Sequence, residues 1–189
     1  MATDVLWAAW EGGGLEHLRL EEAAEGIRAD SLMIQVDERG APFRARFVIE
    51  CDAGWRVSRA RVEVLEAPPR GLDLASDGRG HWTVNGAGDP SLDGCIDMDV
   101  YPSPFTNTLP MRRLTDAVIG RPVAIEVAWV ALPELTVRLD RQEYTLLERG
   151  GDGSRWRFHA PDTGFTVELL TDTNGLVRDY PGIARRVRG

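Results

Sequence analysis

The chain has no lysine, and all 22 of its basic residues are arginine. Arginine suits two-point recognition of anions, but the codon usage of a genome explains a complete lack of lysine more simply. The basic residues are outnumbered by 30 acidic ones, which gives a net charge of -8. Because proteins that bind nucleic acid usually carry a basic excess, we expect no nucleic-acid partner.

Cysteine and long apolar runs are also scarce. Cys51 and Cys95 are far apart and lack the spacing of metal ligands, so we expect reduced thiols, and neither a metal nor another cofactor. No apolar stretch approaches the ~20 residues that a membrane-spanning helix needs. The first residues also lack the pattern of a secretory signal peptide. These absences predict a cytoplasmic protein without a transmembrane segment.

The composition is that of an ordinary globular protein. Hydrophobic residues make up 43% of the 189 residues and charged residues 28%, which is too apolar for a disordered chain. This length is enough to bury a substantial core. No linker-like segment divides the sequence, and we predict a single domain over residues 1–189.

Alternation of apolar and polar side chains, typical of strands, runs through most of the sequence. It is clearest in residues 43–51, where Phe43 and Phe47 fall on the apolar face. Residues 122–131 are the most apolar run and predict a strand buried on both sides. Residues 37–40 read Asp-Glu-Arg-Gly and predict a hairpin turn. Only residues 21–25 suggest a turn of helix.

Many short strands joined by glycine-rich turns predict an all-β fold. So many strands in a flat sheet would leave long exposed edges, so we expect an antiparallel sheet that curls into a spiral or barrel-like shape.

The segment 92–114 contains the most unusual polar pattern. In a strand, Asp93, Asp97 and Asp99 would share one face, with Met98 on the other. Three neighbouring carboxylates repel one another and need a partner. Two arginines follow shortly, at positions 112 and 113, and an arginine fork matches a carboxylate in two-point geometry.

This segment, LDGCIDMDV followed by PFTNTLPMRRL, resembles the putative glycolipid-binding family, a bacterial group first catalogued as a domain of unknown function. Further matching motifs follow the family order: Gly80-His81-Trp82, Val84-Asn85-Gly86, Gln142, Tyr144, Asp179-Tyr180-Pro181-Gly182 and Arg185-Arg186-Val187. The resemblance spans most of the chain. It implies a curled, barrel-like sheet similar to that of the bacterial carriers that shuttle lipoproteins across the envelope and hold acyl chains in a hydrophobic cavity.

We predict one set of ligand-binding residues from these motifs. It comprises Trp82, Asp93, Asp97, Asp99, Tyr101, Asn107, Arg112, Arg113, Gln142, Tyr144, Asp179 and Tyr180. The aspartates and arginines form either a polar rim for sugar hydroxyls, with Trp82 or Tyr101 offering a flat face to a ring, or a buried salt-bridge network that fixes residues 102–110. The C-terminal motif forms either part of the rim or a clasp for the chain end, and its arginines suit an anionic head group.

The resulting prediction is non-catalytic binding of an amphipathic ligand, with a glycolipid as the class that the resemblance implies. Phe43, Phe47 and Ile125 would line an apolar cavity for acyl chains. One alternative is an enzyme acting on a carbohydrate or phosphorylated ligand at Asp97, Asp99 and Arg112, and another is an interaction module without a ligand. No catalytic residue is predicted, because Cys95 and the three histidines lack a catalytic motif. Two aspartates alone are a weak signal for a metal.

Overall fold

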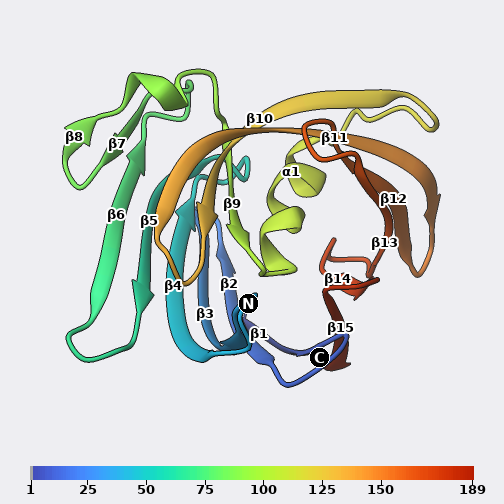
Figure 1. Ribbon diagram of the computed structural model, residues 1–189. Coiled ribbons are helices and arrows are strands. Elements are labelled where there is room, and N and C mark those ends of the chain that lie inside the picture. Colours follow the sequence, from blue (N-terminus) through green and yellow to red (C-terminus); the bar gives the residue numbers. More distant parts are fainter. Residues whose placement is uncertain (1) are drawn as a thin grey trace.

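A curled sheet of 15 strands dominates the computed structural model, which describes residues 2–189 (Figure 1). The strands are β1 (Ala2–Ala9), β2 (Leu15–Ala23), β3 (Gly26–Val36), β4 (Pro42–Cys51), β5 (Val57–Val64), β6 (Arg70–Ser76), β7 (Trp82–Val84), β8 (Ala87–Gly88), β9 (Asp97–Tyr101), β10 (Pro122–Ala131), β11 (Thr136–Gly150), β12 (Gly153–Ala160), β13 (Phe165–Thr171), β14 (Val177–Tyr180) and β15 (Ala184–Arg188). The helices are the 3-10 turns η1 (Pro90–Leu92) and η2 (Phe105–Asn107) and the α-helix α1 (Thr108–Arg113).

The strand order is β8-β7-β6-β5-β4-β3-β2-β1-β15-β14-β13-β12-β11-β10-β9. Among the described strands, neighbours run antiparallel except β9 and β10, which are parallel. The two edges, β8 and β9, do not pair with each other, so the sheet curls without closing. The predicted all-β, curled and mainly antiparallel sheet is confirmed.

Turn chemistry sets the register of the long hairpins. The carboxylate of Asp37 accepts hydrogen bonds from the backbone N–H groups of Arg39 and Ala41, at 2.9 and 2.7 Å. Gly40 has φ +84°, which glycine adopts without steric cost. This turn pairs Val36 with Pro42 and places Phe43 and Phe47 on the concave face of the sheet. The predicted hairpin at residues 37–40 is confirmed.

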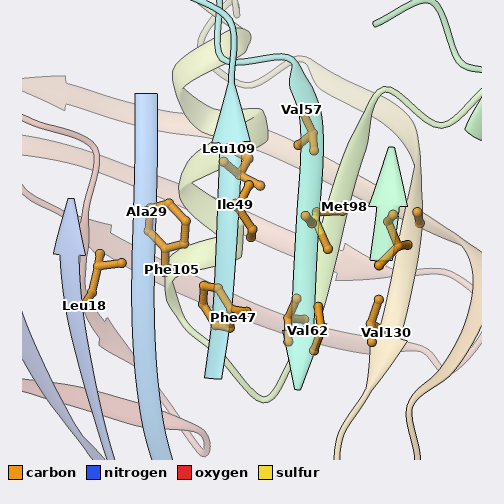
Figure 2. Packing of buried hydrophobic residues seen from close by; sticks show 14 of the residues in the cluster. Leu18, Ala29, Phe47, Ile49, Val57, Val62, Met98, Phe105, Leu109 and Val130 are labelled. Carbon is orange, nitrogen blue, oxygen red and sulfur yellow. The ribbon is translucent and has the colours of Figure 1, made fainter. Parts of the chain in front are cut away.

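The concave side of the sheet is filled by the chain's own side chains (Figure 2). The rings of Phe47 and Phe105 stack with their centroids 6.2 Å apart, and both side chains are fully buried. Leu109 of α1 and Met98 of β9 pack into the same core cluster. The prediction that Phe43 and Phe47 line an open cavity is therefore wrong, because η2, α1 and β9 occupy that space.

The connection from β9 to β10 contains the helix α1, inside the curl of the sheet (Figure 1). Two parallel strands cannot be joined by a tight hairpin, and this segment supplies the longer crossover. Pro110 is tolerated in the first turn of α1, where a backbone N–H has no partner within the helix. Leu109 belongs to the core cluster on the β2–β5 side, and Met111 to a second cluster with β11–β14. The helix thus separates two apolar cores.

Two local predictions are corrected. Residues 21–25 do not form a helical turn, because β2 continues to Ala23 in its ladder with β3. β10 is fully buried on both faces only around residues 127–128, since its first half extends beyond β9. In the part of the chain that is described, the helices are too short to cross a membrane.

Candidate functional site

A buried ion pair links β9 to the end of α1. Met98 and Val100 face the core against β3–β5, so Asp97 turns toward the helix. Arg113 donates from Nε to both oxygens of Asp97, at 3.1 and 3.2 Å, and from Nη2 to Oδ2 at 2.5 Å. The Asp97 side chain is 0% exposed and that of Arg113 18%. Burial raises the pKa of Asp97, and the guanidinium opposes that rise.

The next acidic residue on this face, Asp99, is held by neutral donors. Its carboxylate accepts hydrogen bonds from Thr106 Oγ1 at 2.6 Å and from Gln142 Nε2 at 2.8 Å. Burial raises the pKa of Asp99, and the two hydrogen bonds oppose the rise. Gln142 sits on β11 opposite Ile125 of β10, so this contact fixes β9 relative to the neighbouring strands.

Asn107 connects the network to the aromatic core. Tyr144 donates its phenolic hydrogen to Asn107 Oδ1 at 2.9 Å and more weakly to Gln142 Oε1 at 3.3 Å. The side chain of Asn107 also acts on the phenol of Tyr180 and lowers its pKa. Burial is the main cause that raises the pKa of both phenols, so both stay protonated, and Tyr144 acts as a donor. We call six of these residues the polar network: Asp97, Asp99, Asn107, Arg113, Gln142 and Tyr144.

Three predicted site residues lie away from this network. Asp93 is exposed, because Gly94 adopts φ +99° and the strand begins only at Asp97, so the expected row of three aspartates does not form. Trp82 is 2% exposed and donates its indole N–H to the carbonyl of Cys95 at 2.7 Å. Tyr101 is 41% exposed and lies against Trp129, 6.1 Å between ring centroids.

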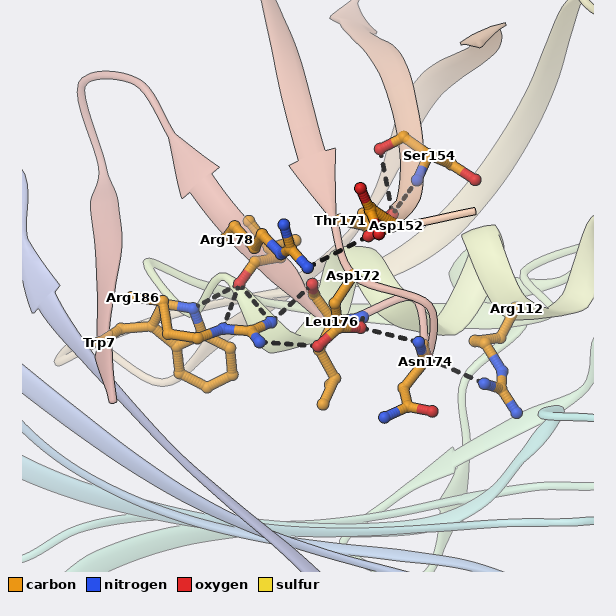
Figure 3. Close-up of polar contacts among 11 residues, drawn as sticks. Trp7, Arg112, Asp152, Ser154, Thr171, Asp172, Asn174, Leu176, Arg178 and Arg186 are labelled. Atoms are coloured by element: carbon orange, nitrogen blue, oxygen red, sulfur yellow. Dashed lines mark hydrogen bonds and ion pairs between the residues drawn. The ribbon is translucent and has the colours of Figure 1, made fainter. Parts of the chain in front are cut away.

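Arg112 reaches the turn that contains Asn174 (Figure 3). It donates to the carbonyl of Asn174 at 2.8 Å and pairs with Glu22 at 3.1 Å. The guanidinium also lies 4.6 Å from the ring centroid of Trp55. The predicted grouping of Asp97, Asp99 and Arg112 is therefore not assembled, since consecutive residues at the end of a helix face different neighbours.

The C-terminal motif is tied to the turn before β14 (Figure 3). Arg186 pairs with Asp172 at 2.7 Å and donates to the carbonyls of Leu176 and Val177 at 2.6 and 2.9 Å. Asp179 faces Arg185 in the β14–β15 ladder. These contacts anchor the last strand, as a clasp would.

The cysteines are buried and unpaired. Burial raises the pKa of Cys51 and of Cys95 to about 12, which keeps both as unreactive thiols. No cluster of three or more histidine, cysteine or carboxylate side chains suited to a metal occurs within residues 2–189.

An open cleft lies beside the polar network, where β10 is longer than β9. Its volume is about 610 Å³, and we call it the first cleft. β9 pairs with β10 only from residue 127 onward, so residues 122–126 have no strand partner on this edge within the described chain. The lining residues are Gly94, Ile96, Arg113, Leu114, Val123, Ala124, Ile125, Glu126, Arg141, Gln142, Glu143 and Pro161.

Arg113, Gln142 and Ile125 were anticipated from the sequence, and the rest of this lining was not. The missing residues come from five separate segments whose proximity depends on the pairing of β10 with β9 and β11. The one local signal was Leu114, which directly follows the paired arginines at the end of the matched motif.

Comparison with known proteins agrees with the motifs. The sequence model of the family described as "Putative glycolipid-binding" matches residues 4–186. The crystal structure of a DUF1089 family protein from Pseudomonas aeruginosa has 35% sequence identity and a TM-score of 0.83, and the match covers 94% of each chain. No curated protein matches this sequence.

Proposed function

Because the chain belongs to the putative glycolipid-binding family, we propose that it binds a glycolipid, without catalysis, in the first cleft. The observation that carries the proposal is the composition of that cleft. Ile96, Leu114 and Ile125 supply apolar surface from three different segments, next to the charged and amide groups of Arg113 and Gln142. An apolar wall with a few convergent polar groups is typical of sites for small amphipathic molecules.

The outer polar groups of the cleft suit sugar hydroxyls. Arg141 and Glu126 are 63% and 41% exposed and pair only loosely, at 3.7 Å. A solvated ion pair of this kind contributes ~1 kcal/mol or less, so exchanging it for hydroxyl contacts costs little. Glu143 adds a further acceptor on the same wall.

The polar network lies behind this surface. Asp97 fixes Arg113, and Asp99 with Tyr144 fixes Gln142, through the contacts already described. We assign these three residues a positioning role, since side chains held in one orientation lose little entropy on binding. The first cleft is not lined by the other predicted residues, which are Trp82, Asp93, Tyr101, Asn107, Arg112, Asp179 and Tyr180.

The size of the cleft bounds the ligand. A volume of about 610 Å³ falls within the ~300–1,000 Å³ of small-molecule sites. It accommodates a head group with the adjoining part of a chain, while the rest of the acyl tails stay outside. Each methylene that enters contributes ~0.8 kcal/mol, or about fourfold in affinity.

Titration calorimetry with octyl, decyl and dodecyl maltoside, each below its micelle concentration, tests the proposal. We expect affinity to rise with chain length until the cleft is full. Ile125→Gln should weaken binding of the dodecyl compound about tenfold. Leu170→Gln, at a position 41% exposed on β13, is the matched control and should bind as the wild type does.

Equal affinity for the three chain lengths, or unchanged binding by Ile125→Gln, would contradict the proposal. Chromatography of the recovered maltosides separates binding from catalysis, since an enzyme would return free sugar. Asp99→Asn adds a second discrimination. A catalytic acid would lose turnover and keep affinity, whereas a positioning residue loses affinity with no turnover to lose.

A further inference from the structure

A second cleft, of about 590 Å³, opens on the other side of Arg113. Four arginines line it from three parts of the fold: Arg56 after the β4–β5 turn, Arg112 and Arg113 at the end of α1, and Arg149 in β11. The remaining lining residues are Ala53, Gly54, Trp55, Met111 and Thr115. This lining contains no carboxylate, although acidic residues outnumber basic ones in the whole chain.

Two of the four arginines in this cleft form direct ion pairs with carboxylates outside its lining. Arg112 pairs with Glu22 and Arg113 with Asp97. Within residues 2–189, no carboxylate oxygen lies within 4.0 Å of the guanidinium nitrogens of Arg56 or Arg149. Arg56 and Arg149 therefore face the same open volume without a direct ion pair to the protein, and the carboxylate of Asp97 acts on Arg56 only at longer range.

The turn that carries Arg56 is held in one conformation. Asp52 Oδ1 accepts from the backbone N–H groups of Gly54 and Arg56, both at 2.9 Å. A Cβ at Gly54 would lie 2.9 Å from Nη1 of Arg56, so the guanidinium rests directly over the glycine. A larger residue at this position would displace it.

Trp55 in this turn has an unusual backbone. Its φ is +64°, a conformation that bulky residues rarely adopt, and its side chain is 5% exposed beneath the guanidinium of Arg112. Such strained backbone is concentrated at functional sites. Here it places the ring of Trp55 against the guanidinium of Arg112, while Arg56, the next residue in the sequence, lines the same cleft.

We infer that the second cleft binds a phosphate group. Arginine forks match the oxygens of a phosphate in two-point geometry, and unpaired guanidiniums on ordered segments need little reorganisation to do so. The phosphate is either free in solution or part of a lipid head group. Arg113 lines both clefts, so a phosphorylated glycolipid would reach both at once, a step that rests on the proposed function.

Titration calorimetry at low ionic strength with inorganic phosphate, dodecyl phosphate and neutral dodecyl maltoside tests the inference. The double variant Arg56→Gln/Arg149→Gln removes the two guanidinium charges that have no direct ion-pair partner. The double variant Arg39→Gln/Arg59→Gln removes the same charge from exposed residues that line neither cleft and is the matched control. Near-UV circular dichroism checks that each variant is folded.

We expect the wild type and the control to bind inorganic phosphate, and Arg56→Gln/Arg149→Gln to lose at least about tenfold in affinity. Tighter binding of dodecyl phosphate than of inorganic phosphate, weakened by Ile125→Gln, supports a lipid head group as the source. Equal binding of the two anions supports free phosphate.

Failure of the wild type to bind either anion overturns the inference, as does wild-type affinity in Arg56→Gln/Arg149→Gln. If dodecyl maltoside binds while both anions fail, the anion site is wrong and the proposed glycolipid site stands. If the anions bind while dodecyl maltoside does not, the proposed glycolipid binding is contradicted and the phosphate site stands.

Discussion

Arg113 lies at the junction of the two clefts, and the fully buried carboxylate of Asp97 fixes its guanidinium there. The pair joins the edge strand β9 to α1, the helix that fills the curl of the sheet. The position of Arg113, which both clefts share, therefore depends on one buried ionic contact.

Replacing Asp97 with Asn should destabilise the protein strongly. The change removes the charge and leaves the guanidinium of Arg113 mostly buried without a counter-ion, which costs ~3–5 kcal/mol. Urea unfolding at pH 7 measures the loss. Asp93→Asn is the control, because Asp93 is exposed and should change the free energy of unfolding by less than about 0.5 kcal/mol. Equal effects of the two changes would show that the ion pair does not stabilise the fold.

Glu16 should make stability fall as the pH rises. Its side chain is buried, Oε1 accepts from Ser31 and Ser103 at 2.7 Å each, and Oε2 has no hydrogen-bond partner in the protein. Burial raises its pKa from 4.5 to about 7. Between these two values the unfolded chain releases the proton and the folded protein keeps it, so the folded state loses up to ~3 kcal/mol of stability by pH 8.

Glu16→Gln should remove this dependence. The variant should be more stable than the wild type at pH 8 and lose that advantage at pH 4.5, as measured by urea unfolding at several pH values. The difference between the two proteins isolates Glu16 from the other titrating groups. A constant difference across the pH range would mean that Glu16 ionises normally in the folded state.

Phe47→Ala tests whether the concave side of the sheet is filled. Phe47 is fully buried against Phe105, so the truncation leaves a void and should cost ~3–5 kcal/mol. Val48→Ala, on the outer face of the same strand and partly exposed, should cost less than about 1.5 kcal/mol. A loss at Phe47 as small as that at Val48 would indicate that Phe47 faces open space.

Gly153→Ala should disrupt the β11–β12 hairpin. Gly153 has φ +137°, and a Cβ there would lie 1.9 Å from the backbone oxygen of Thr171. Because neither backbone can yield without breaking the ladder, we expect a loss of at least ~2 kcal/mol in thermal or urea unfolding. A Cβ on Gly151 in the same turn meets nothing within 4 Å, so Gly151→Ala should be tolerated. Similar stability of both variants would refute the predicted clash.

The sequence predicted those features that depend on the alternation of side chains within a single strand. The apolar face of residues 43–51 and the alternation of Asp97, Met98 and Asp99 were predicted and found. The helix α1 was not predicted, because six residues are too few to establish a period of 3.6. The first cleft escaped prediction for another reason, since it arises from the unequal lengths of β9 and β10, which only the pairing reveals.

The β1–β15 ladder joins the two halves of the sheet, whereas the other neighbouring strands are consecutive in the sequence. During synthesis Ala2–Ala9 precede their partner strand, which is complete only after Arg188 has been added. Until then one side of β1 offers free N–H and C=O groups to any passing strand. Before β15 has been made, the unpaired edge of β1 is therefore the place where the nascent chain most needs protection from aggregation with other chains.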